Sequence, residues 1–436
     1  MEHQKYLDKA RDTLQEKTPL MDPGQLSAFV GKFITDRRRY LDAYERSGSP
    51  LYLFDERALI RKAKEFRKAF SSELREFSIF YALKSNGHPF ILEGLIKEGY
   101  GIDVSSGKEL EQALRHSPKE IIFSGPGKTV DELYLACGHT DTVTVLIDSF
   151  GELLRLEEAA AGKGVKIKAG VRLMVEEKGL WRKFGVPLGD LERFFEEAEK
   201  CPHVVLCGLQ FHSSWNLDAG KQTAFIERLG GVLARMEEEV LKKIKFVDIG
   251  GGYWPVQGEW IQPSATPEGL LRQCIEPGPM DVMEHHCVPS LPIGEFSRRL
   301  SNALKENVFK YADCKVYLEP GRWISHETMH ILLKVIDKKA DDTVICDGGI
   351  NMIGWERYET DYFPVINLSN PALEEHPCMI FGSLCTPHDL WGYSYFGQGI
   401  GPGDILLVPA QGAYTYSLRQ EFIKPVPEVH RLRDEV

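Results

Sequence analysis

Short apolar runs alternate with amphipathic segments between about residue 75 and residue 321. The apolar runs are rich in β-branched and aromatic residues and read FSIFYALKS, GIDVSS, EIIFSG, VTVLID, KAGVRLM, VVLCGLQFH, FVDIGGG and KVYLEPG. The segments between them, such as GKELEQALRH and LERFFEEAEK, place apolar residues at helical spacing. Strands that alternate with helices predict a parallel sheet built from βα units. Eight such strands predict an α/β TIM barrel with helices outside.

The pattern changes after residue 322. The runs ILLKVIDKK, TVICDGG, PCMIFGSLC and DILLVPAQGAY are strand-like, and no regular helices separate them. They predict a C-terminal antiparallel β domain, joined by the N-terminal residues that include PLYLFD. The predicted domains are therefore a barrel over residues 56–322 and a β domain made of residues 1–55 and 323–436.

About sixty residues separate DIGGGYW from KVYLEPG, which is more than one crossover helix needs. This segment is rich in Pro and Gly and predicts an insertion in the barrel over about residues 254–295. Its position at the end of a strand makes it a candidate lid or substrate-selecting element. Its His285–His286 pair is interpreted as part of a solvated loop and not as a metal site, because no partner has ligand-like spacing.

The composition and the net charge argue against several classes of protein. The net charge is −11, which argues against a nucleic-acid binder because such a protein needs a basic face. The N-terminal residues carry acids and lack an apolar core, so a signal peptide is not expected. No apolar run is long enough to span a bilayer. The nine cysteines lack CxxC spacing, which favours reduced thiols and a cytoplasmic protein.

Polar residues and glycines follow the predicted strands at one end of the barrel. In a TIM barrel this end carries the active site. The strand ends hold Lys84, Asp103, Ser124, Asp148, Arg172, His212, the glycines 250–252 and the run 319–322. A lysine that ends the run FYALKSN can simply extend to solvent. The convergence of the strand ends instead predicts a pocket around Lys84.

Two motifs favour a phosphate site in this pocket. DIGGG lets backbone N–H groups approach a phosphate closely, although a glycine triplet also forms tight turns. Arg322, in EPGR, can form a forked pair of hydrogen bonds with a phosphate. These motifs end the seventh and eighth strands, where TIM barrels often hold phosphate. A phosphate site beside a pocket lysine predicts pyridoxal 5′-phosphate (PLP) attached to Lys84.

Eight motifs occur in an order that resembles a known family: YALKSN, IDVSSGKEL, FSGPGK, FH, DIGGG, EPGR, GSLCTPHD and GAYT. From about residue 50 to residue 425, the chain is similar to the PLP-dependent fold-type III decarboxylases of the diaminopimelate, ornithine and arginine group. Its layout most resembles diaminopimelate decarboxylase-like proteins, which act in lysine biosynthesis. The resemblance implies an alanine-racemase-like barrel and an amino-acid carboxy-lyase that releases CO2 through an external aldimine and a quinonoid.

The resemblance also implies roles for residues of the barrel. Lys84 would form the internal aldimine, His212 would stack on the cofactor ring, and Glu319 would face the pyridine nitrogen. Asp103 would support the cofactor, although a structural salt bridge is the alternative for it and for Arg172. The phosphate would be held by Gly251, Gly252, Gly321, Arg322 and Tyr414.

The motif GSLCTPHD lies in the predicted β domain and contains Cys385 and Asp389. In the family, such residues enter the active site of the neighbouring subunit, so the resemblance implies a homodimer with shared active sites. Cys385 would protonate the α-carbon after CO2 leaves, and Asp389 would pair with the distal amine of a small amino-acid substrate. Arg322 and Tyr414 would also contact the substrate. The alternative is that the cysteine and the aspartate belong to a core and a turn.

Three departures from the family concern the substrate. Trp215 stands where a phosphate-contacting serine is expected. Thr386 replaces a glutamate after the cysteine, and a threonine cannot pair with an ammonium as a carboxylate does. Arg357 is the nearest candidate for a distal carboxylate, and it is displaced from the expected position. These changes favour a different diamino acid or biosynthetic intermediate of siderophore, polyamine or antibiotic type, while diaminopimelate remains possible.

Two other functions are alternatives. An alanine racemase of this barrel type has an arginine against the pyridine nitrogen, whereas Glu319 favours decarboxylation. A catalytically silent regulatory homologue would be free to lose Lys84, Glu319, Arg322 and Cys385, and all four are present.

Overall fold

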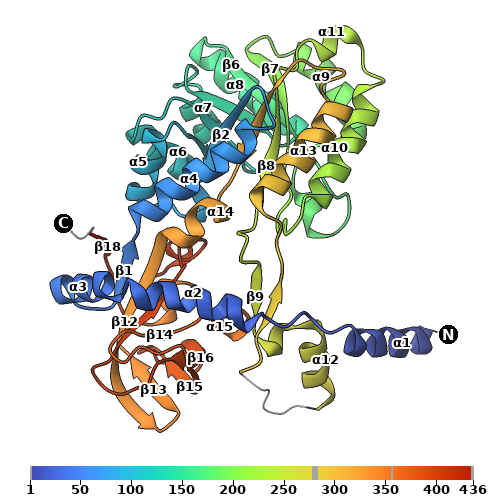
Figure 1. Cartoon of the computed structure of the whole chain (residues 1–436). Coiled ribbons are helices and arrows are strands. Elements are labelled where there is room, and N and C mark those ends of the chain that lie inside the picture. Colours follow the sequence, from blue (N-terminus) through green and yellow to red (C-terminus); the bar gives the residue numbers. More distant parts are fainter. Residues whose placement is uncertain (1, 277–282, 355–356, 434–436) are drawn as a thin grey trace. The chain divides into compact units, whose positions relative to one another are not determined.

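The computed structural model describes residues 2–276, 283–354 and 357–433. The chain divides into two compact units (Figure 1). One unit contains residues 57–256 and 291–325, and the other contains residues 1–56, 257–290 and 326–436. The first unit is called the barrel unit below, and the second is called the β unit.

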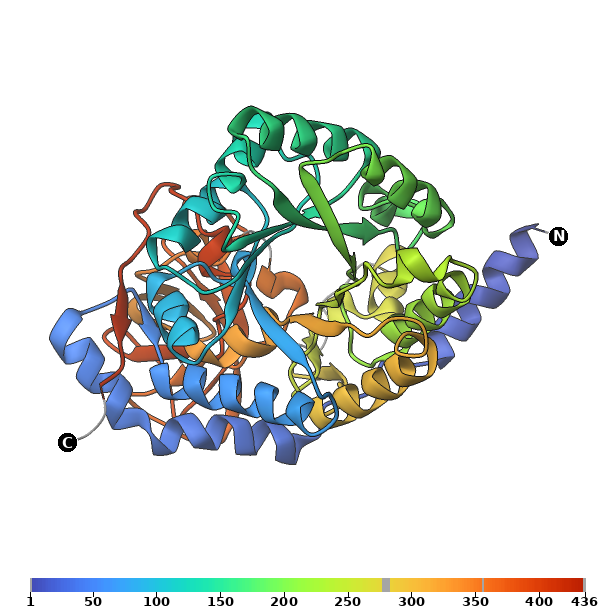
Figure 2. The same ribbon diagram turned by 90° about the horizontal axis from the view of Figure 1, so that it is seen from above.

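The barrel unit holds a closed barrel of eight parallel strands, in the spatial order β11-β2-β3-β4-β5-β6-β7-β8. Viewed from above, the strands form a ring with helices on its outside (Figure 2). The strands are β2 (Phe77–Ala82), β3 (Gly101–Val104), β4 (Ile121–Phe123), β5 (Val143–Ile147), β6 (Ile167–Leu173), β7 (Val204–Phe211), β8 (Phe246–Gly251) and β11 (Lys315–Glu319). All eight predicted runs form strands, and the predicted TIM barrel is confirmed.

Large apolar side chains fill the interior of the barrel near the start of its strands. Phe80, Ile122, Leu146 and Phe246 form a buried cluster, in which the ring of Tyr317 stacks on Phe246 at 4.4 Å between centroids. Glycines 170 and 208 make room for the Phe246 ring, since a Cβ at either would lie 2.8 Å or 2.1 Å from it. Buried polar side chains replace this apolar layer toward the other end of the strands. The polar end is where the strands finish.

Helices follow the barrel strands, and several begin at a polar residue just after a strand. The side chains of Ser106, Thr129 and Ser149 each accept a backbone N–H bond three residues on, which stabilises the helix start. The helices of this unit include α4 (Glu56–Ser71), α5 (Pro89–Lys97), α6 (Gly107–Arg115), α7 (Val130–Ala136), α8 (Phe150–Lys163), α9 (Leu191–Glu199), α10 (Gly220–Leu233), α11 (Glu238–Leu241), α13 (Ile293–Asn307) and α14 (Arg322–Ser325). Within the described part of the chain, none of the helices has the length and apolar character needed to cross a membrane.

The β unit is built on an eight-stranded sheet in the order β13-β15-β16-β14-β17-β12-β1-β18. Most pairings are antiparallel, as predicted, but β1–β18, β13–β15 and β14–β16 are parallel. The strands are β1 (Leu51–Phe54), β12 (Met329–Ala340), β13 (Thr343–Cys346), β14 (Ile366–Asn367), β15 (Glu375–Phe381), β16 (Leu390–Phe396), β17 (Ile405–Val408) and β18 (Val429–Arg431). Consecutive residues of β12 alternate between two cores: Ile331 and Leu333 join one, and Leu332 joins the other.

The N-terminal helices α1 (Glu2–Gln15), α2 (Pro23–Thr35) and α3 (Arg37–Ser47) also belong to the β unit. Val30 and Phe33 of α2 and Tyr40 of α3 lie in the same buried cluster as Leu332 of the sheet. The helices α2 and α3 therefore cover one face of the sheet.

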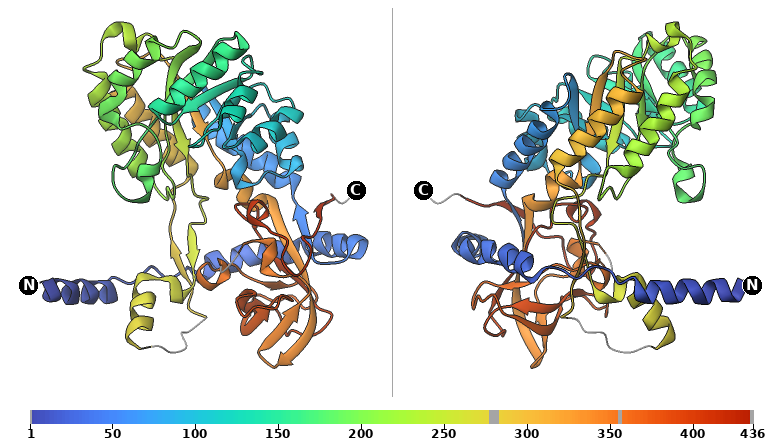
Figure 3. Two further views of the ribbon diagram at one scale, coloured as in Figure 1. Left: turned by 180° about the vertical axis from the view of Figure 1, so that it is seen from behind. Right: turned by 45° about the vertical axis from the view of Figure 1, so that its right-hand side comes forward.

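Most of the predicted insertion does not belong to the barrel. Residues 257–290 group with the β unit and not with the barrel. They form β9 (Glu259–Ile261), β10 (His286–Val288) and α12 (Pro267–Ile275), with the two strands paired side by side (Figure 3). The cause is a set of backbone hydrogen bonds: Met21 N donates to His285 O at 2.9 Å, and Gln262 N donates to Thr360 O at 2.8 Å.

The interpretation of His285 and His286 as part of a solvated loop is wrong, because both side chains are buried. His285 Nε2 lies 2.9 Å from both carboxylate oxygens of Glu375, and its ring stacks on Tyr362 at 3.7 Å. His286 Nδ1 lies 3.0 Å from the carbonyl oxygen of Thr18. Both histidines thus attach the inserted segment to the rest of the β unit.

Candidate active site

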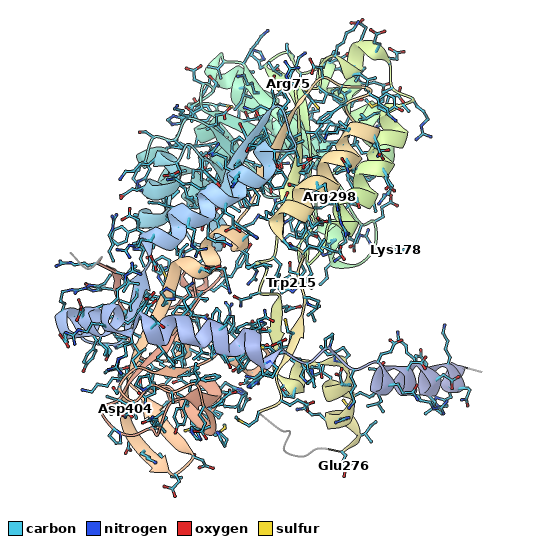
Figure 4. All side chains as sticks on the ribbon, in the orientation of Figure 1. Arg75, Lys178, Trp215, Glu276, Arg298 and Asp404 are labelled. Atoms are coloured by element: carbon cyan, nitrogen blue, oxygen red, sulfur yellow. The ribbon has the colours of Figure 1, made fainter. Side chains whose placement is uncertain are left out.

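The polar end of the barrel brings together four side chains that the sequence singled out. Lys84 lies in a short 3₁₀ turn directly after β2, Asp103 lies in β3, His212 directly follows β7, and Glu319 ends β11. Figure 4 labels Arg75, just before β2, at one end of the barrel and Trp215, after β7, at the other. Because parallel strands all finish at the same end, these residues converge there.

Lys84 leaves a buried strand and reaches a buried carboxylate. Its Nζ lies 3.7 Å from Asp103 Oδ2, and the Lys84 side chain is 36% exposed while that of Asp103 is fully buried. The hydroxyl of Ser124 donates to Asp103 Oδ1 at 2.5 Å. Burial and the charge of Glu319 raise the pKa of Asp103, and Lys84 and Ser124 oppose this rise. Lys84 therefore has a buried carboxyl neighbour but remains accessible.

Glu319 and His212 form the second pair. His212 Nδ1 lies 3.2 Å from Glu319 Oε2, and the amide of Gln210 donates to Oε1 at 3.2 Å. Burial alone would raise the pKa of Glu319, but the hydrogen bond to His212 and the charge of Lys84 hold that pKa below its ordinary value. Burial lowers the pKa of His212. The pair therefore contains an ionised carboxylate, and the N–H of Gly251 also lies within hydrogen-bond distance of His212 Nδ1, at 3.2 Å.

The DIGGG turn approaches neighbouring backbone so closely that side chains are excluded. A Cβ at Gly251 would lie 2.0 Å from the carbonyl oxygen of Glu319, and a Cβ at Gly252 would lie 2.4 Å from that of Ser213. Gly252 also has a φ of +78°, where glycine is favoured. Asn216 ties this turn to the loop after β7, because its amide donates to Gly251 O at 2.9 Å and its N–H donates to Gly252 O at 3.0 Å.

The EPGR turn packs against the segment that carries Lys84. A Cβ at Gly321 would lie 3.0 Å from the Cβ of Ser85, so glycine permits this close approach. Arg322 begins α14, and its Cζ lies 4.2 Å from the ring centroid of Trp254. The two motifs predicted to bind phosphate are therefore neighbours at this end of the barrel.

A family model for the pyridoxal-dependent decarboxylases, pyridoxal-binding domain, matches residues 56–326, which is more than half of the chain. The chain belongs to this family. It is therefore a PLP-dependent amino-acid decarboxylase, and the predicted reaction class and cofactor are confirmed.

Similar proteins cover most of the chain. The diaminopimelate decarboxylase of Methanothermobacter thermautotrophicus is 27% identical over 391 residues, which are 86% of this chain and 84% of that protein. An L-glutamyl-[BtrI acyl-carrier protein] decarboxylase of Niallia circulans is 24% identical over 86% of each chain. The solved structure of Helicobacter pylori diaminopimelate decarboxylase with L-lysine has a TM-score of 0.73 and 24% identity, covering 91% of this chain and 94% of that one. At this identity the structural likeness shows the shared fold.

The residues at the polar end fit PLP, as four observations show. A lysine amine is accessible at the strand end. An ionised carboxylate is buried beside it, as the pyridine nitrogen of PLP requires. The glycine turn carries no side chains of its own, so a phosphate can approach its backbone closely. Asp103 Oδ2 and Gln210 Oε1 are buried without a hydrogen-bond partner among the described residues.

Three predicted site residues belong to the β unit. Cys385 is exposed in the turn between β15 and β16. Tyr414 has a φ of +57°, and its carbonyl oxygen accepts a bond from Arg357 Nη1 at 3.3 Å. Asp389 is 1% exposed, and its two oxygens accept N–H bonds from Ile350 at 2.7 Å and from Leu384 at 2.6 Å. These bonds favour a positioning role for Asp389 over the predicted contact with a substrate amine.

Lys128, in the motif FSGPGK, is a structural residue in this chain. Its Nζ lies 2.7 Å from Glu152 Oε1 and donates to Gly125 O at 2.7 Å, and both charged side chains are buried. Arg172 Nε lies 3.9 Å from Asp148 Oδ1 with both side chains buried. This ion pair favours the salt-bridge alternative for Arg172.

Sequence reasoning missed Gln210, Asp248 and Asn216. Gln210 and Asp248 are polar residues in apolar strands, two positions before His212 and Gly250, so they share the inward face of their strands. This period of two could have revealed them. Asp248 Oδ1 accepts the N–H of Gly250 at 2.9 Å, and burial with the charge of Glu319 raises its pKa. No comparable signal marks Asn216, whose amide donates to two backbone carbonyls and accepts the hydroxyl of Ser213 at 3.1 Å.

Proposed function

We propose that this chain removes CO2 from the α-carbon of an amino acid at the polar end of the barrel, with Lys84 bonding the cofactor. The observation that carries this is the convergence of an accessible lysine with an ionised Glu319 and its partner His212. When bound, PLP supplies the electron-accepting ring that makes the loss of CO2 feasible.

Each barrel residue then has a task that its surroundings support. Glu319 keeps a proton on the pyridine nitrogen, since a buried carboxylate held ionised stabilises a neighbouring cation. His212, held by Glu319, would pack against the face of the ring. The backbone of the glycine turn, Gly321 and Arg322 would bind the phosphate.

Cys385 gives a proton to the α-carbon after CO2 has left. It is exposed in its turn, so it is available to a substrate. The turn is held by Asp389, which accepts the N–H of Leu384, the residue before Cys385. The role of Asp389 in this proposal is to position that turn.

The proposed substrate lacks the second amino-acid end of diaminopimelate. Similar proteins are named for diaminopimelate and for a carrier-bound glutamyl group, so the family accepts different distal ends. In this chain the charged candidates for a distal end are engaged within the β unit: Arg357 donates to Ala413 O at 3.2 Å, and Asp389 accepts two backbone bonds. Thr386 has no charge. A different diamino acid or a biosynthetic intermediate with a modified distal end is the substrate class that these contacts favour.

The test is CO2 release from the PLP-loaded protein with a panel of amino acids. The panel contains meso-diaminopimelate, both enantiomers of lysine, ornithine, arginine and glutamate, and carboxylated polyamine precursors. Release from a member other than diaminopimelate is expected. Release from diaminopimelate alone would refute the proposed substrate class but not the reaction. An enzyme that inverts the α-carbon without releasing CO2 would refute the reaction.

The proposal includes a homodimer with shared active sites in the cytoplasm. All nine cysteines are free, which supports a reducing compartment. Mixing Lys84→Ala with Cys385→Ser protein, each inactive alone, should restore about a quarter of the activity, because half of the dimers are hybrids with one intact site. No recovery after subunit exchange would refute shared sites. Cell fractionation tests the compartment.

A further inference from the structure

Trp215 has a backbone conformation that is rare for a large side chain. Its φ is +56°, in the left-handed region, and its side chain is 55% exposed. Such a conformation persists only where neighbouring contacts enforce it, and it marks residues with a task. The left-handed residue therefore needs an explanation in its surroundings.

Asn216 enforces this conformation by hydrogen bonds to both sides of the turn. Its amide donates to Ser213 O at 3.1 Å and to Gly251 O at 2.9 Å. Its carbonyl oxygen accepts the N–H of Trp254 at 3.2 Å. The loop after β7 is thus fastened to the loop after β8, with Trp215 at the bend. Figure 4 shows Trp215 at the end of the barrel where these strands finish.

The bend brings the two indoles together beside a cation. The ring centroids of Trp215 and Trp254 lie 5.3 Å apart with a tilt of 42°. The Arg322 Cζ lies 4.2 Å from the Trp254 centroid and 5.6 Å from the Trp215 centroid. Both distances are within the range of cation–π attraction. Arg322 therefore faces two aromatic rings that belong to two different loops.

An arginine that contacts aromatic rings can also bind an anion. The N–H groups of an arginine lie in the guanidinium plane, and they bind phosphate or carboxylate through that edge. Trp254 is two residues after Gly252, so the same contact keeps Arg322 beside the glycine turn. Holding a flexible arginine in this position before binding reduces the entropy lost when an anion arrives.

We propose that Trp215 is a positioning residue: with Trp254 it holds the guanidinium of Arg322 at the phosphate-binding edge of the glycine turn. This rests on the proposed function, in which Arg322 binds the phosphate of PLP. The family resemblance implies a phosphate-contacting serine at this position. In this chain the indole of Trp215 would act on the phosphate indirectly, through Arg322.

The test measures binding of PLP to the apoprotein by quenching of tryptophan fluorescence, with inorganic phosphate as a second probe. Trp215→Ala should raise the dissociation constants for both probes by roughly 2- to 30-fold, the range of a cation–π contact. Trp215→Phe should restore most of the affinity, because it keeps an aromatic face. Trp215→Asn keeps the left-handed bend, since asparagine tolerates it, and should bind as weakly as the alanine variant.

A double-mutant cycle with Arg322→Ala separates an indirect role from a direct one. Trp215→Ala should have no further effect in the Arg322→Ala background. A matched control is Tyr134→Ala, which removes an exposed ring with Lys163 Nζ 4.1 Å from its centroid, on α7 and away from the site. Its PLP affinity should equal that of the unchanged protein.

The inference is overturned if Trp215→Ala binds PLP as tightly as the unchanged protein, or weakens binding equally with and without Arg322. The second result would make Trp215 a direct ligand or a wall of the substrate pocket. Failure of the proposed function gives a different result, in which the unchanged protein itself does not bind PLP. That result would overturn the proposed function and this inference with it.

Discussion

The Nζ of Lys84 lies 3.7 Å from the Oδ2 of Asp103, which links the end of β2 to the neighbouring strand β3 inside the barrel. The lysine is partly exposed and the carboxylate is buried. This arrangement keeps the amine at the polar end of the barrel, where a cofactor can reach it, and explains why an apolar strand ends in a lysine.

Lys84→Ala should abolish retention of PLP after gel filtration and should abolish CO2 release. The reason is that Lys84 supplies the accessible amine that directly follows β2 at this end of the barrel. Circular dichroism and the melting temperature should stay close to those of the unchanged protein, because the side chain is not part of the core. Lys97→Ala, on α5, is the matched control and should retain both properties. Normal turnover by Lys84→Ala would refute the proposed function.

Glu319→Gln should bind PLP but lose roughly 10²-fold or more of kcat, the usual cost of removing one preorganised electrostatic contact. A glutamine cannot keep a proton on the pyridine nitrogen as an ionised carboxylate does. The measurement is kcat at saturating PLP, with bound cofactor determined by absorbance. Glu120→Gln, at an exposed position, should behave as the unchanged protein. An unchanged kcat for Glu319→Gln would exclude the proposed role of the carboxylate.

The barrel could be predicted because its signals are local. Each strand is an apolar run that ends in a polar residue or a glycine, and this is also why Lys84, Asp103, His212 and Glu319 could be selected. The same period-two pattern would have added Gln210. The mixed pairing in the β unit was not predictable, because β1 pairs in parallel with β18, which lies close to the other end of the chain.

Other parts depend on contacts for which the sequence carries no pattern. The inserted segment groups with the β unit through backbone hydrogen bonds such as Met21 N to His285 O. The partners of Asp389 are also backbone N–H groups, which nearly every residue has. A resemblance can therefore suggest a role for a carboxylate without showing which N–H groups donate hydrogen bonds to it.

Gly251→Ala should weaken PLP binding and lower the free energy of unfolding by about 1–3 kcal/mol, the usual cost of overpacking. The added Cβ would lie 2.0 Å from the carbonyl oxygen of Glu319, so the turn or the end of β11 must move. Urea denaturation and PLP titration measure the two effects. Gly231→Ala, in α10, meets no atom within 4 Å and should be neutral or slightly stabilising. Equal behaviour of the two variants would contradict the steric argument.

Asp389→Ala should lower the free energy of unfolding by about 2–4 kcal/mol, because two buried N–H groups lose their charged acceptor. The lost bonds are those from Ile350 and Leu384, at 2.7 Å and 2.6 Å. Asp404→Ala in the same unit is not a suitable control, since that residue also accepts hydrogen bonds. Asp341→Ala, on an exposed turn, should leave stability unchanged. If Asp389→Ala keeps its stability and only raises KM, the substrate contact would replace the positioning role.

The stability of the β unit should depend on pH through His330, which lies in β12. Burial lowers the pKa of this histidine from 6.5 to about 4, and its Nδ1 accepts the N–H of Ala410 at 3.1 Å. Between these pH values the native ring is neutral while the unfolded chain binds a proton. The free energy of unfolding should therefore rise with pH across this window, by about 3 kcal/mol in total.

His330→Gln removes the titration while its amide oxygen can still accept a hydrogen bond. The measurement is the midpoint of urea unfolding for both proteins from pH 4 to pH 7, compared as a difference so that all other titrating groups cancel. The difference should change steeply below pH 6.5 and level off above it. A difference that is constant with pH would show that the native protein binds the proton as readily as the unfolded chain.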